Sequence, residues 1–325
     1  MTTIEHAETT QPAPTPAGGR AWLPLAAVAF TLVTWASAFV AIRHLGEGVP
    51  PGALSLGRLV VAVVVLGALV FSRRGRIRLP ARSAWPLIVL GGAAWIGVYN
   101  LTLNASERRI DAGTAALIVQ VGPIVVAVLA TVFLGERLTH WLVIGLVVGF
   151  AGVALIARAT SGGSSGDLFG VLLAFIAALT FAVGVLSQKR LLDSGLTALE
   201  MTLWFYVVGL VVCVPWSGQL VDVVRSASGS DLAWIVYLGV VPSAIAFTTW
   251  AYALSQAHAG RFALTTFLVP FITALMAWAT LDEVPPALAF VGGALCIGGV
   301  LLTRRGDHAP AAPPPAVEAG APDEP

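Results

Sequence analysis

Long apolar runs constrain the fold of this chain more than any other feature. Hydrophobic residues make up 57% of its 325 residues and charged residues only 11%, which is more apolar surface than a soluble core could hide. A backbone surrounded by lipid must satisfy its polar groups within its own segment, so runs of this length are expected to be membrane-spanning helices. We predict ten spans, at residues 22–42, 53–72, 85–104, 112–134, 141–158, 168–188, 199–216, 232–253, 261–281 and 286–303. The expected class is therefore an all-α integral membrane protein.

The second feature is an internal duplication with a constant offset of 147 positions. Five residues of the first half recur in the second without a gap. The pairs are Gly113 and Gly260, Pro123 and Pro270, Glu136 and Glu283, Gly145 and Gly292, and Gly152 and Gly299. Five spans per copy is an odd number, so the second copy must enter the membrane from the opposite side. Inverted repeats create a cavity at their interface and favour alternating access.

This duplication predicts the domain boundaries. The first five-helix repeat is expected at residues 22–158 and the second at 168–303, with a Gly/Ser linker at 159–167 between them. The tails at residues 1–21 and 304–325 are rich in proline and alanine and poor in bulky apolar groups, so we expect both to be disordered.

Positive charge is distributed unequally between alternate connectors. With a cytoplasmic N-terminus, twelve basic residues fall inside and five outside. The connector containing Arg73, Arg74, Arg76, Arg78 and Arg82 supplies most of the difference. This bias predicts that both termini are cytoplasmic. The usage of 17 arginines and one lysine, with abundant alanine, valine and glycine, suggests a bacterial genome, so a multi-pass protein of a bacterial cell membrane is expected.

A longer motif surrounds the repeated residues. Each copy has Ala-Gly-x-x-Ala-Leu, a proline ten residues after that glycine, a glutamate, and then two glycines seven residues apart followed by valine. This pattern resembles the EamA family of the drug/metabolite transporter superfamily over residues 22 to 303. The resemblance implies ten helices, cytoplasmic ends, and export or exchange of amino acids, other metabolites or toxic compounds.

Seven polar or amphipathic side chains within the spans are our candidates for a substrate cavity, because planar and amide groups can orient an organic solute. They are Trp35, Arg58, Tyr99, Asn100, Gln120, Trp250 and Tyr252. Arg58 is the charge expected to lie deepest, and its partner is a carbonyl cluster, water, a distant carboxylate or an anionic substrate group. The alternatives are snorkelling of its head group and a structural tie.

Two residue pairs have expected mechanical roles. Pro123 and Pro270 lie inside the fourth and ninth spans, where each is either a hinge beside the cavity or a static kink. Glu136 and Glu283 lie at turns between helices, where each carboxylate is expected to cap the amino end of the next helix. Proton coupling by these glutamates is the alternative.

Several functional classes find no support in the sequence. There is no basic stripe for nucleic acid, no cofactor or nucleotide motif, no catalytic constellation, and no histidine or cysteine cluster for a metal. The preferred hypothesis is therefore a secondary transporter of a small organic solute, with export favoured. Proton exchange is the default mode of coupling, but it is weakened because the spans lack an evident buried acid. Facilitated diffusion and solute exchange are the alternatives. The alternatives are a membrane scaffold or chaperone and a membrane-embedded enzyme; the oligomeric state is not predicted.

Overall fold

The computed structural model describes residues 22–45, 48–110, 112–160, 167–281 and 286–304. Within these ranges the chain is helical, without strands. Among the described residues, nine helical segments are long and apolar enough to span a bilayer, and Ala287–Thr303 is a shorter apolar helix. The predicted tails, most of the linker and Glu283 lie outside the described residues.

The elements of the first half begin with α1 (Trp22–Leu45) and α2 (Pro51–Arg74). The remaining elements of this half are η2 (Arg82–Ala84), α3 (Trp85–Gly91), η3 (Gly92–Val98), α4 (Tyr99–Ser106), α5 (Ala112–Val119), α6 (Val121–Leu134) and α7 (His140–Thr160).

The second half begins with α8 (Leu168–Leu191) and η4 (Leu192–Ser194). It continues with α9 (Ala198–Cys213), η5 (Val214–Trp216), α10 (Ser217–Ser226), α11 (Gly229–Leu238), η6 (Gly239–Ile245), α12 (Ala246–Ser255), α13 (Ala259–Ala263), η7 (Leu264–Phe267), α14 (Leu268–Leu281) and α15 (Ala287–Arg304).

Helix boundaries repeat with the same offset as the sequence motif. Helices α2, α4, α5 and α7 each begin 147 residues before α9, α12, α13 and α15 respectively. The correspondence extends to irregular structure, because η3 and η6 are both π-helices and also differ by 147 positions. The two halves therefore share their backbone conformation in detail.

The fourth span of each half is interrupted. Gln120 separates α5 from α6, and the 3₁₀ segment η7 separates α13 from α14. Pro123 and Pro270 are the third residues of α6 and α14, in a first turn whose N–H groups have no intrahelical acceptor. The interruption thus precedes each proline, and neither proline removes a bond from the middle of a continuous helix.

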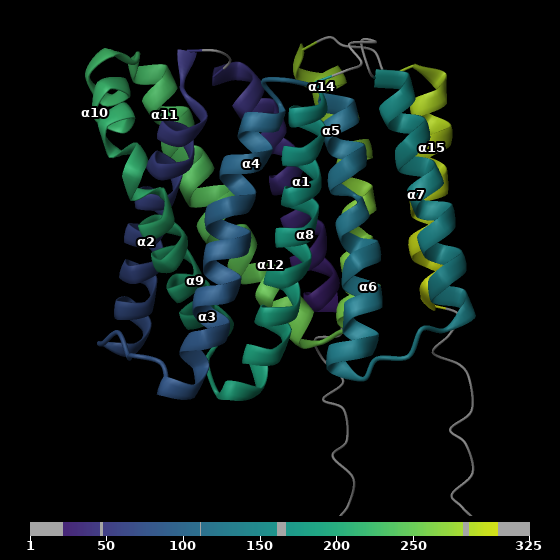
Figure 1. Cartoon of the computed structure of the whole chain (residues 1–325), viewed down its shortest axis with the longest axis horizontal. Helices are drawn as coiled ribbons and strands as arrows, with labels where there is room; N and C mark the ends of the chain where they lie inside the picture. The colour runs from purple at the N-terminus through teal and green to yellow at the C-terminus, as the bar shows by residue number, and fades with distance from the viewer. Residues whose placement is uncertain (1–21, 46–47, 111, 161–166, 282–285, 305–325) are drawn as a thin grey trace, which may run out of the picture.

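Helices α7 and α15 pack antiparallel along one edge of the bundle through facing glycines (Figure 1). A Cβ atom on Gly152 would lie 2.5 Å from the Gly292 carbonyl oxygen, and one on Gly145 would lie 2.7 Å from the Gly299 oxygen. Since Gly292 and Gly299 are the repeat counterparts of Gly145 and Gly152, each helix presents the same surface to the other. The contact has the two-fold symmetry expected of inverted repeats.

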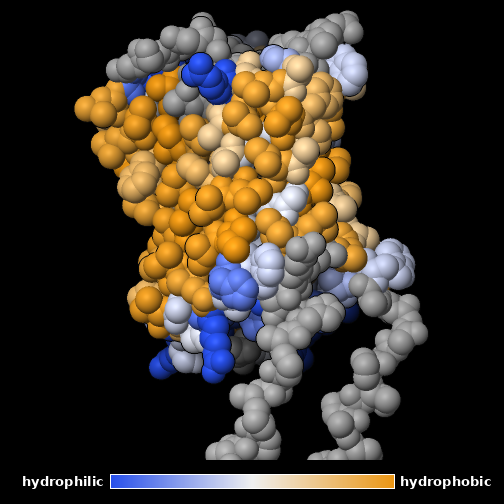
Figure 2. All heavy atoms as spheres, turned by 90° about the vertical axis from the view of Figure 1, so that its right-hand side faces the viewer, coloured by the Kyte–Doolittle hydropathy of each residue, from blue (hydrophilic) through white to orange (hydrophobic). Residues whose placement is uncertain are grey.

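The bundle has an apolar belt between two more polar ends (Figure 2). We call one end, lower in Figure 1, the arginine-rich end; α2, α6, α8 and α12 finish there. Its described basic residues include Arg73, Arg74, Lys189 and Arg190. Lys189 donates to the carbonyl oxygens of Leu254, in the last turn of α12, and of Ala257, just beyond it, at 3.1 and 2.5 Å. A cation stabilises the carboxyl end of a helix in this way.

The opposite end is closed by apolar packing. The seventh span does not stop near residue 216, as predicted; Val214–Trp216 form a 3₁₀ turn around Pro215, and α10 continues to Ser226. Val223 of α10 packs into a group that we call the upper apolar cluster. Its buried members are Ala38, Ala41, Leu45, Val49, Ala53, Leu54, Val223, Ile235 and Leu238.

Candidate functional site

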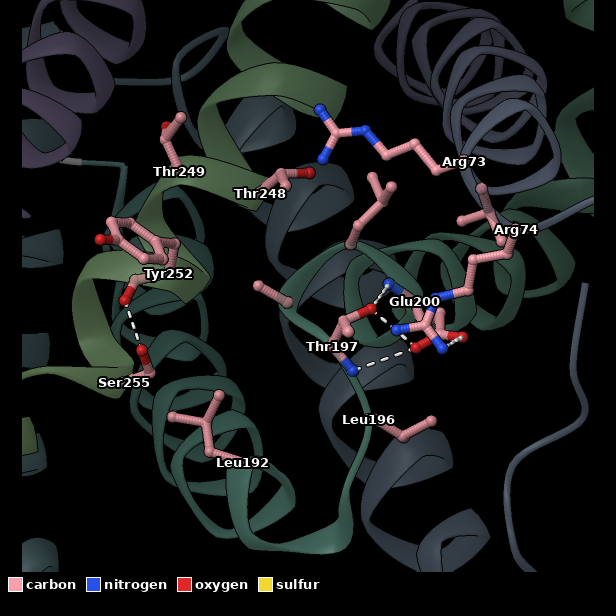
Figure 3. Close-up of a pocket in the computed structure, with 13 residues that line it drawn as sticks. Arg73, Arg74, Leu192, Leu196, Thr197, Glu200, Thr248, Thr249, Tyr252 and Ser255 are labelled. Atoms are coloured by element: carbon pink, nitrogen blue, oxygen red, sulfur yellow. Dashed lines mark hydrogen bonds and ion pairs between the residues drawn. The ribbon is translucent and has the colours of Figure 1, made fainter. Parts of the chain in front are cut away.

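A pocket of about 690 Å³ lies at the arginine-rich end, between α2, the start of α9 and α12 (Figure 3). This volume is within the usual range for small-molecule sites. One wall is apolar, and α12 supplies a wall of hydroxyl groups. The lining residues are Val70, Arg73, Arg74, Leu192, Leu196, Thr197, Ala198, Leu199, Glu200, Thr248, Thr249, Tyr252 and Ser255.

Glu200 is the acidic group of this pocket and is only 4% exposed. Its Oε2 accepts hydrogen bonds from the Thr197 backbone N–H at 3.1 Å and the Thr197 hydroxyl at 2.7 Å, which forms a capping box at the start of α9. Arg74 Nη1 lies 3.4 Å from Glu200 Oε1. The expectation that the spans lack a buried acid was therefore wrong, because local capping satisfies a carboxylate that burial would otherwise penalise.

The two ends of the molecule differ at equivalent positions. Arg73, Leu192, Leu196 and Glu200 of the pocket correspond, at the 147-residue offset, to Leu220, Leu45, Val49 and Ala53. Those four counterparts pack together in or against the upper apolar cluster. One end is consequently hollow and charged, whereas the matching place at the other end is filled with apolar side chains.

An aromatic core occupies the interior between α1, η3, α8 and α12. Trp35 stacks on Trp250 with ring centroids 4.8 Å apart, and Trp95 and Phe247 pack around them. The indole nitrogen of Trp250 is fully buried and has no hydrogen-bond partner among the described residues. An unsatisfied buried donor of this kind costs about 1–3 kcal/mol, so it is a feature that a polar group entering the core could relieve.

Arg58 is buried in α2, with 7% of its surface exposed. Its Nε and Nη2 donate to the Ser243 hydroxyl at 3.1 and 2.9 Å, and that hydroxyl donates to the Leu238 carbonyl oxygen at 2.7 Å. No carboxylate pairs with Arg58 in the described part of the chain. It is held by a neutral partner, and its charge is not compensated by an acid.

The candidates chosen from the sequence do not converge on one place. Of the seven, Tyr252 lines the pocket, while Trp35 and Trp250 lie in the aromatic core. The Asn100 amide donates to the carbonyl oxygen of Ile96 in its own span at 2.9 Å. Partly exposed Tyr99 lies near Arg58 and interacts electrostatically with it.

Gln120 and Glu136 connect the two repeats. Gln120 Nε2 donates to the Thr266 carbonyl oxygen at 2.6 Å, which joins the interruptions of the two broken spans. Glu136 accepts hydrogen bonds from the backbone N–H groups of Ala259 and Gly260 at 2.6 and 3.0 Å. Its carboxylate therefore caps α13 in the second repeat, and not α7 as expected from sequence order.

Most of the pocket lining is absent from the site predicted from the sequence. Arg73 and Arg74 enter that prediction only as charges that indicate the topology, and Glu200 and Thr248 are not among the candidate residues. One available signal was that Arg73 lies fifteen residues after Arg58 on the same helix, close to a whole number of turns. The long-range approach of α12 to the end of α2 had no signature in the sequence.

A bundle of two inverted helical repeats, hollow at one end and sealed at the other, is the architecture of a membrane transporter. The chain matches the EamA-like transporter family over residues 22–158 and 168–305, and it belongs to that family. It is thus a multi-pass membrane transporter and not an enzyme, in agreement with the resemblance found in its repeated motif.

Individual relatives are similar along most of the chain. A "probable terminal-alkyne amino-acid exporter" of Streptantibioticus cattleyicolor is 38% identical, covering 86% of this chain and 92% of the relative. The uncharacterized transporter YdfC of Bacillus subtilis is 32% identical, over 83% and 87% of the two chains. A solved crystal structure with 21% identity superposes with a TM-score of 0.71, covering 88% of this chain and 99% of its own. That structure supports the fold alone.

Proposed function

We propose that this transporter exports a small organic solute, of the amino-acid or related metabolite class, by alternating access from the arginine-rich end. The difference between the two ends carries the proposal. Inverted repeats can exchange conformations, so the end that is now packed can become hollow while the hollow end closes. The name of the Streptantibioticus relative supports the solute class and the outward direction.

In this mechanism the solute first occupies the pocket at the arginine-rich end and then reaches the aromatic core. Arg58, which is hydrogen-bonded to Ser243 of η6, supplies a cation without an acidic partner in the described structure, and such a cation is suited to a carboxylate. The Trp250 indole N–H supplies a further donor. Counter-movement of a proton or a second solute would drive the cycle, and the arginine-rich end would face the cytoplasm, as its charge favours.

A pair of cysteine variants related by the repeat tests this proposal. Leu196→Cys lies in the pocket wall, and Val49→Cys lies at the equivalent place in the upper apolar cluster. The native cysteines, Cys213 and Cys296, are buried, and the unmodified protein serves as the control for them. A membrane-impermeant maleimide, applied to either face of oriented vesicles, reports which end is open.

At rest, Leu196→Cys should react from the arginine-rich face and Val49→Cys should be protected. During solute counterflow, labelling of Val49→Cys from the other face should rise. Absence of counterflow for every amino acid and cationic drug in a broad panel, together with unchanging labelling, would support the scaffold alternative instead.

A further inference from the structure

Arg73 is a cation of the pocket that has no partner in the described structure. Its neighbour Arg74 turns to Glu200, whereas Arg73 extends from α2 toward the wall formed by α12 (Figure 3). No hydrogen bond or ion pair holds the Arg73 side chain among the described residues. Since Arg74 and Glu200 offset one another, the pocket keeps one uncompensated positive charge.

Hydrogen-bond acceptors lie on α12, the wall toward which Arg73 extends (Figure 3). The Thr248 hydroxyl donates its proton to the Ala244 carbonyl oxygen at 2.7 Å, so the lone pairs of its oxygen remain free to accept. The phenolic oxygen of Tyr252 has no hydrogen-bond partner within the described chain and is available as well. A cation and neutral acceptors in one pocket match the carboxylate and the ammonium of one zwitterion.

Part of the pocket lining is apolar. Val70, Leu192, Leu196 and Leu199 supply hydrophobic side chains to the lining, beside the polar groups. A solute that uses this pocket fully would therefore carry a carboxylate, an ammonium group and an apolar side chain. A glutamate or a lysine would place a second charge against leucine side chains, which is unfavourable.

We propose that this pocket is the loading site for apolar amino acids, with Arg73 receiving the carboxylate and Thr248 the ammonium group. The inference deepens the transport function proposed above and rests on it for its physiological meaning. Arg73 determines which solutes load, because it requires a carboxylate. Thr248 supplies the weaker, neutral half of the recognition.

The proposal is tested by binding, independently of transport. Purified Leu196→Cys protein in lipid-free detergent is labelled with maleimide while L-phenylalanine, phenylalaninamide, phenethylamine or 3-phenylpropanoate is titrated. L-phenylalanine should slow labelling at least fivefold at saturation, and 3-phenylpropanoate should protect more weakly. The amide and the amine, which lack a carboxylate, should not protect. Inorganic phosphate should leave the rate unchanged; protection by phosphate would assign Arg73 to phosphate groups, including those of lipids.

The matched variants are Arg73→Gln and Arg76→Gln, which remove the same charge from the same stretch of chain. Arg76 does not line the pocket. Arg73→Gln should raise the half-protecting concentration of L-phenylalanine at least tenfold. Arg73→Lys should raise this concentration less, and Arg76→Gln should leave it unchanged. Three results would overturn the loading site. They are equal effects of Arg73→Gln and Arg76→Gln, protection by phenylalaninamide equal to that by L-phenylalanine, and no protection by L-phenylalanine.

Failure of the loading site and failure of the transport function are distinguishable. If protection depends on Arg73 but liposomes show no counterflow, the loading site is supported and the transport function is rejected. If Arg73→Gln shows counterflow of L-phenylalanine with the same half-saturating concentration as the unmodified protein, the transport function is supported and the loading site is rejected.

Discussion

Individual side chains tie the two repeats together. Glu136 uses both carboxylate oxygens on the backbone N–H groups of Ala259 and Gly260. The amino end of a helix carries partial positive charge, so an anion there is favourable. His258 Nδ1 lies 3.9 Å from the same carboxylate, but it is an exposed neighbour on the solvent side.

Glu136→Gln should lower the free energy of unfolding by about 1–3 kcal/mol, because it replaces charge-assisted bonds with weaker ones in a partly buried place. Unfolding in mixed micelles measures the change. Asp222→Asn on α10 is the control, since the exposed Asp222 carboxylate makes no hydrogen bond or ion pair with the described residues. Equal effects in the two variants would show that charge alone, and not the cap, matters.

Arg58 allows stability and transport to be separated. Replacing a buried charge with a neutral side chain is often neutral or stabilising, whereas a solute carboxylate would lose its partner. Arg58→Gln should therefore unfold no more easily than the unmodified protein and yet transport at least about tenfold more slowly, equivalent to about 1.4 kcal/mol. Undiminished counterflow by correctly folded Arg58→Gln would leave Arg58 with a structural role only.

At the scale of elements, irregular helices recur where the repeats face the interior. The π-helix η6 contains Pro242, and a proline could by itself explain the π-helical conformation of η6. The equivalent residue of η3 is Trp95, and η3 is a π-helix nonetheless. The irregularity therefore belongs to the shared backbone of the repeats and not to one proline. π-Helical turns often occur at functional sites, and both of these contribute to the surroundings of the aromatic core.

Neighbouring glycines of α15 give a sharp test of helix packing. A Cβ atom on Gly299 would lie 2.7 Å from the Gly145 oxygen and the Gly149 nitrogen, whereas one on Gly298 would meet nothing within 4 Å. Gly299→Ala should cost about 1–3 kcal/mol by forcing α7 and α15 apart. Gly298→Ala should be neutral or slightly stabilising, since alanine favours a helix. Equal unfolding free energies for the two variants would contradict the packing described for this edge.

The sequence predicted the spans well because hydrophobicity and turn residues are local properties. It placed the starts of α5 and α8 at the residues where the structure begins them. It could not predict the interruption at Gln120 or the length of the seventh span, because both depend on packing between helices distant in sequence. The pocket was missed for the same reason: Arg73 and Thr248 are brought together only by the approach of α2 to α12.

At the scale of the whole molecule, charge and cavity coincide at one end. The pocket and most of the predicted cytoplasmic arginines share that end, so a solute loaded there would be exported. A fluorescent protein that matures only in the cytoplasm, fused to the carboxyl terminus, should be bright. Replacing Arg76, Arg78 and Arg82 with glutamine should lower that signal, because the positive-charge bias weakens while the pocket residues stay intact. A dark fusion of a well-expressed chain would reverse the predicted orientation.

The glycine contact between α7 and α15 also bears on the ancestry of the molecule. Because each helix presents the same surface to its counterpart, the contact needs no covalent link between the halves. A gene encoding five helices, whose product inserted in both orientations, could have formed the same seam as a homodimer. Fusion of two such genes would then have fixed one copy in each orientation. From that point the sequences of the two halves would have been free to diverge. Only after that step could one end keep arginine and glutamate where the other end acquired leucine and alanine.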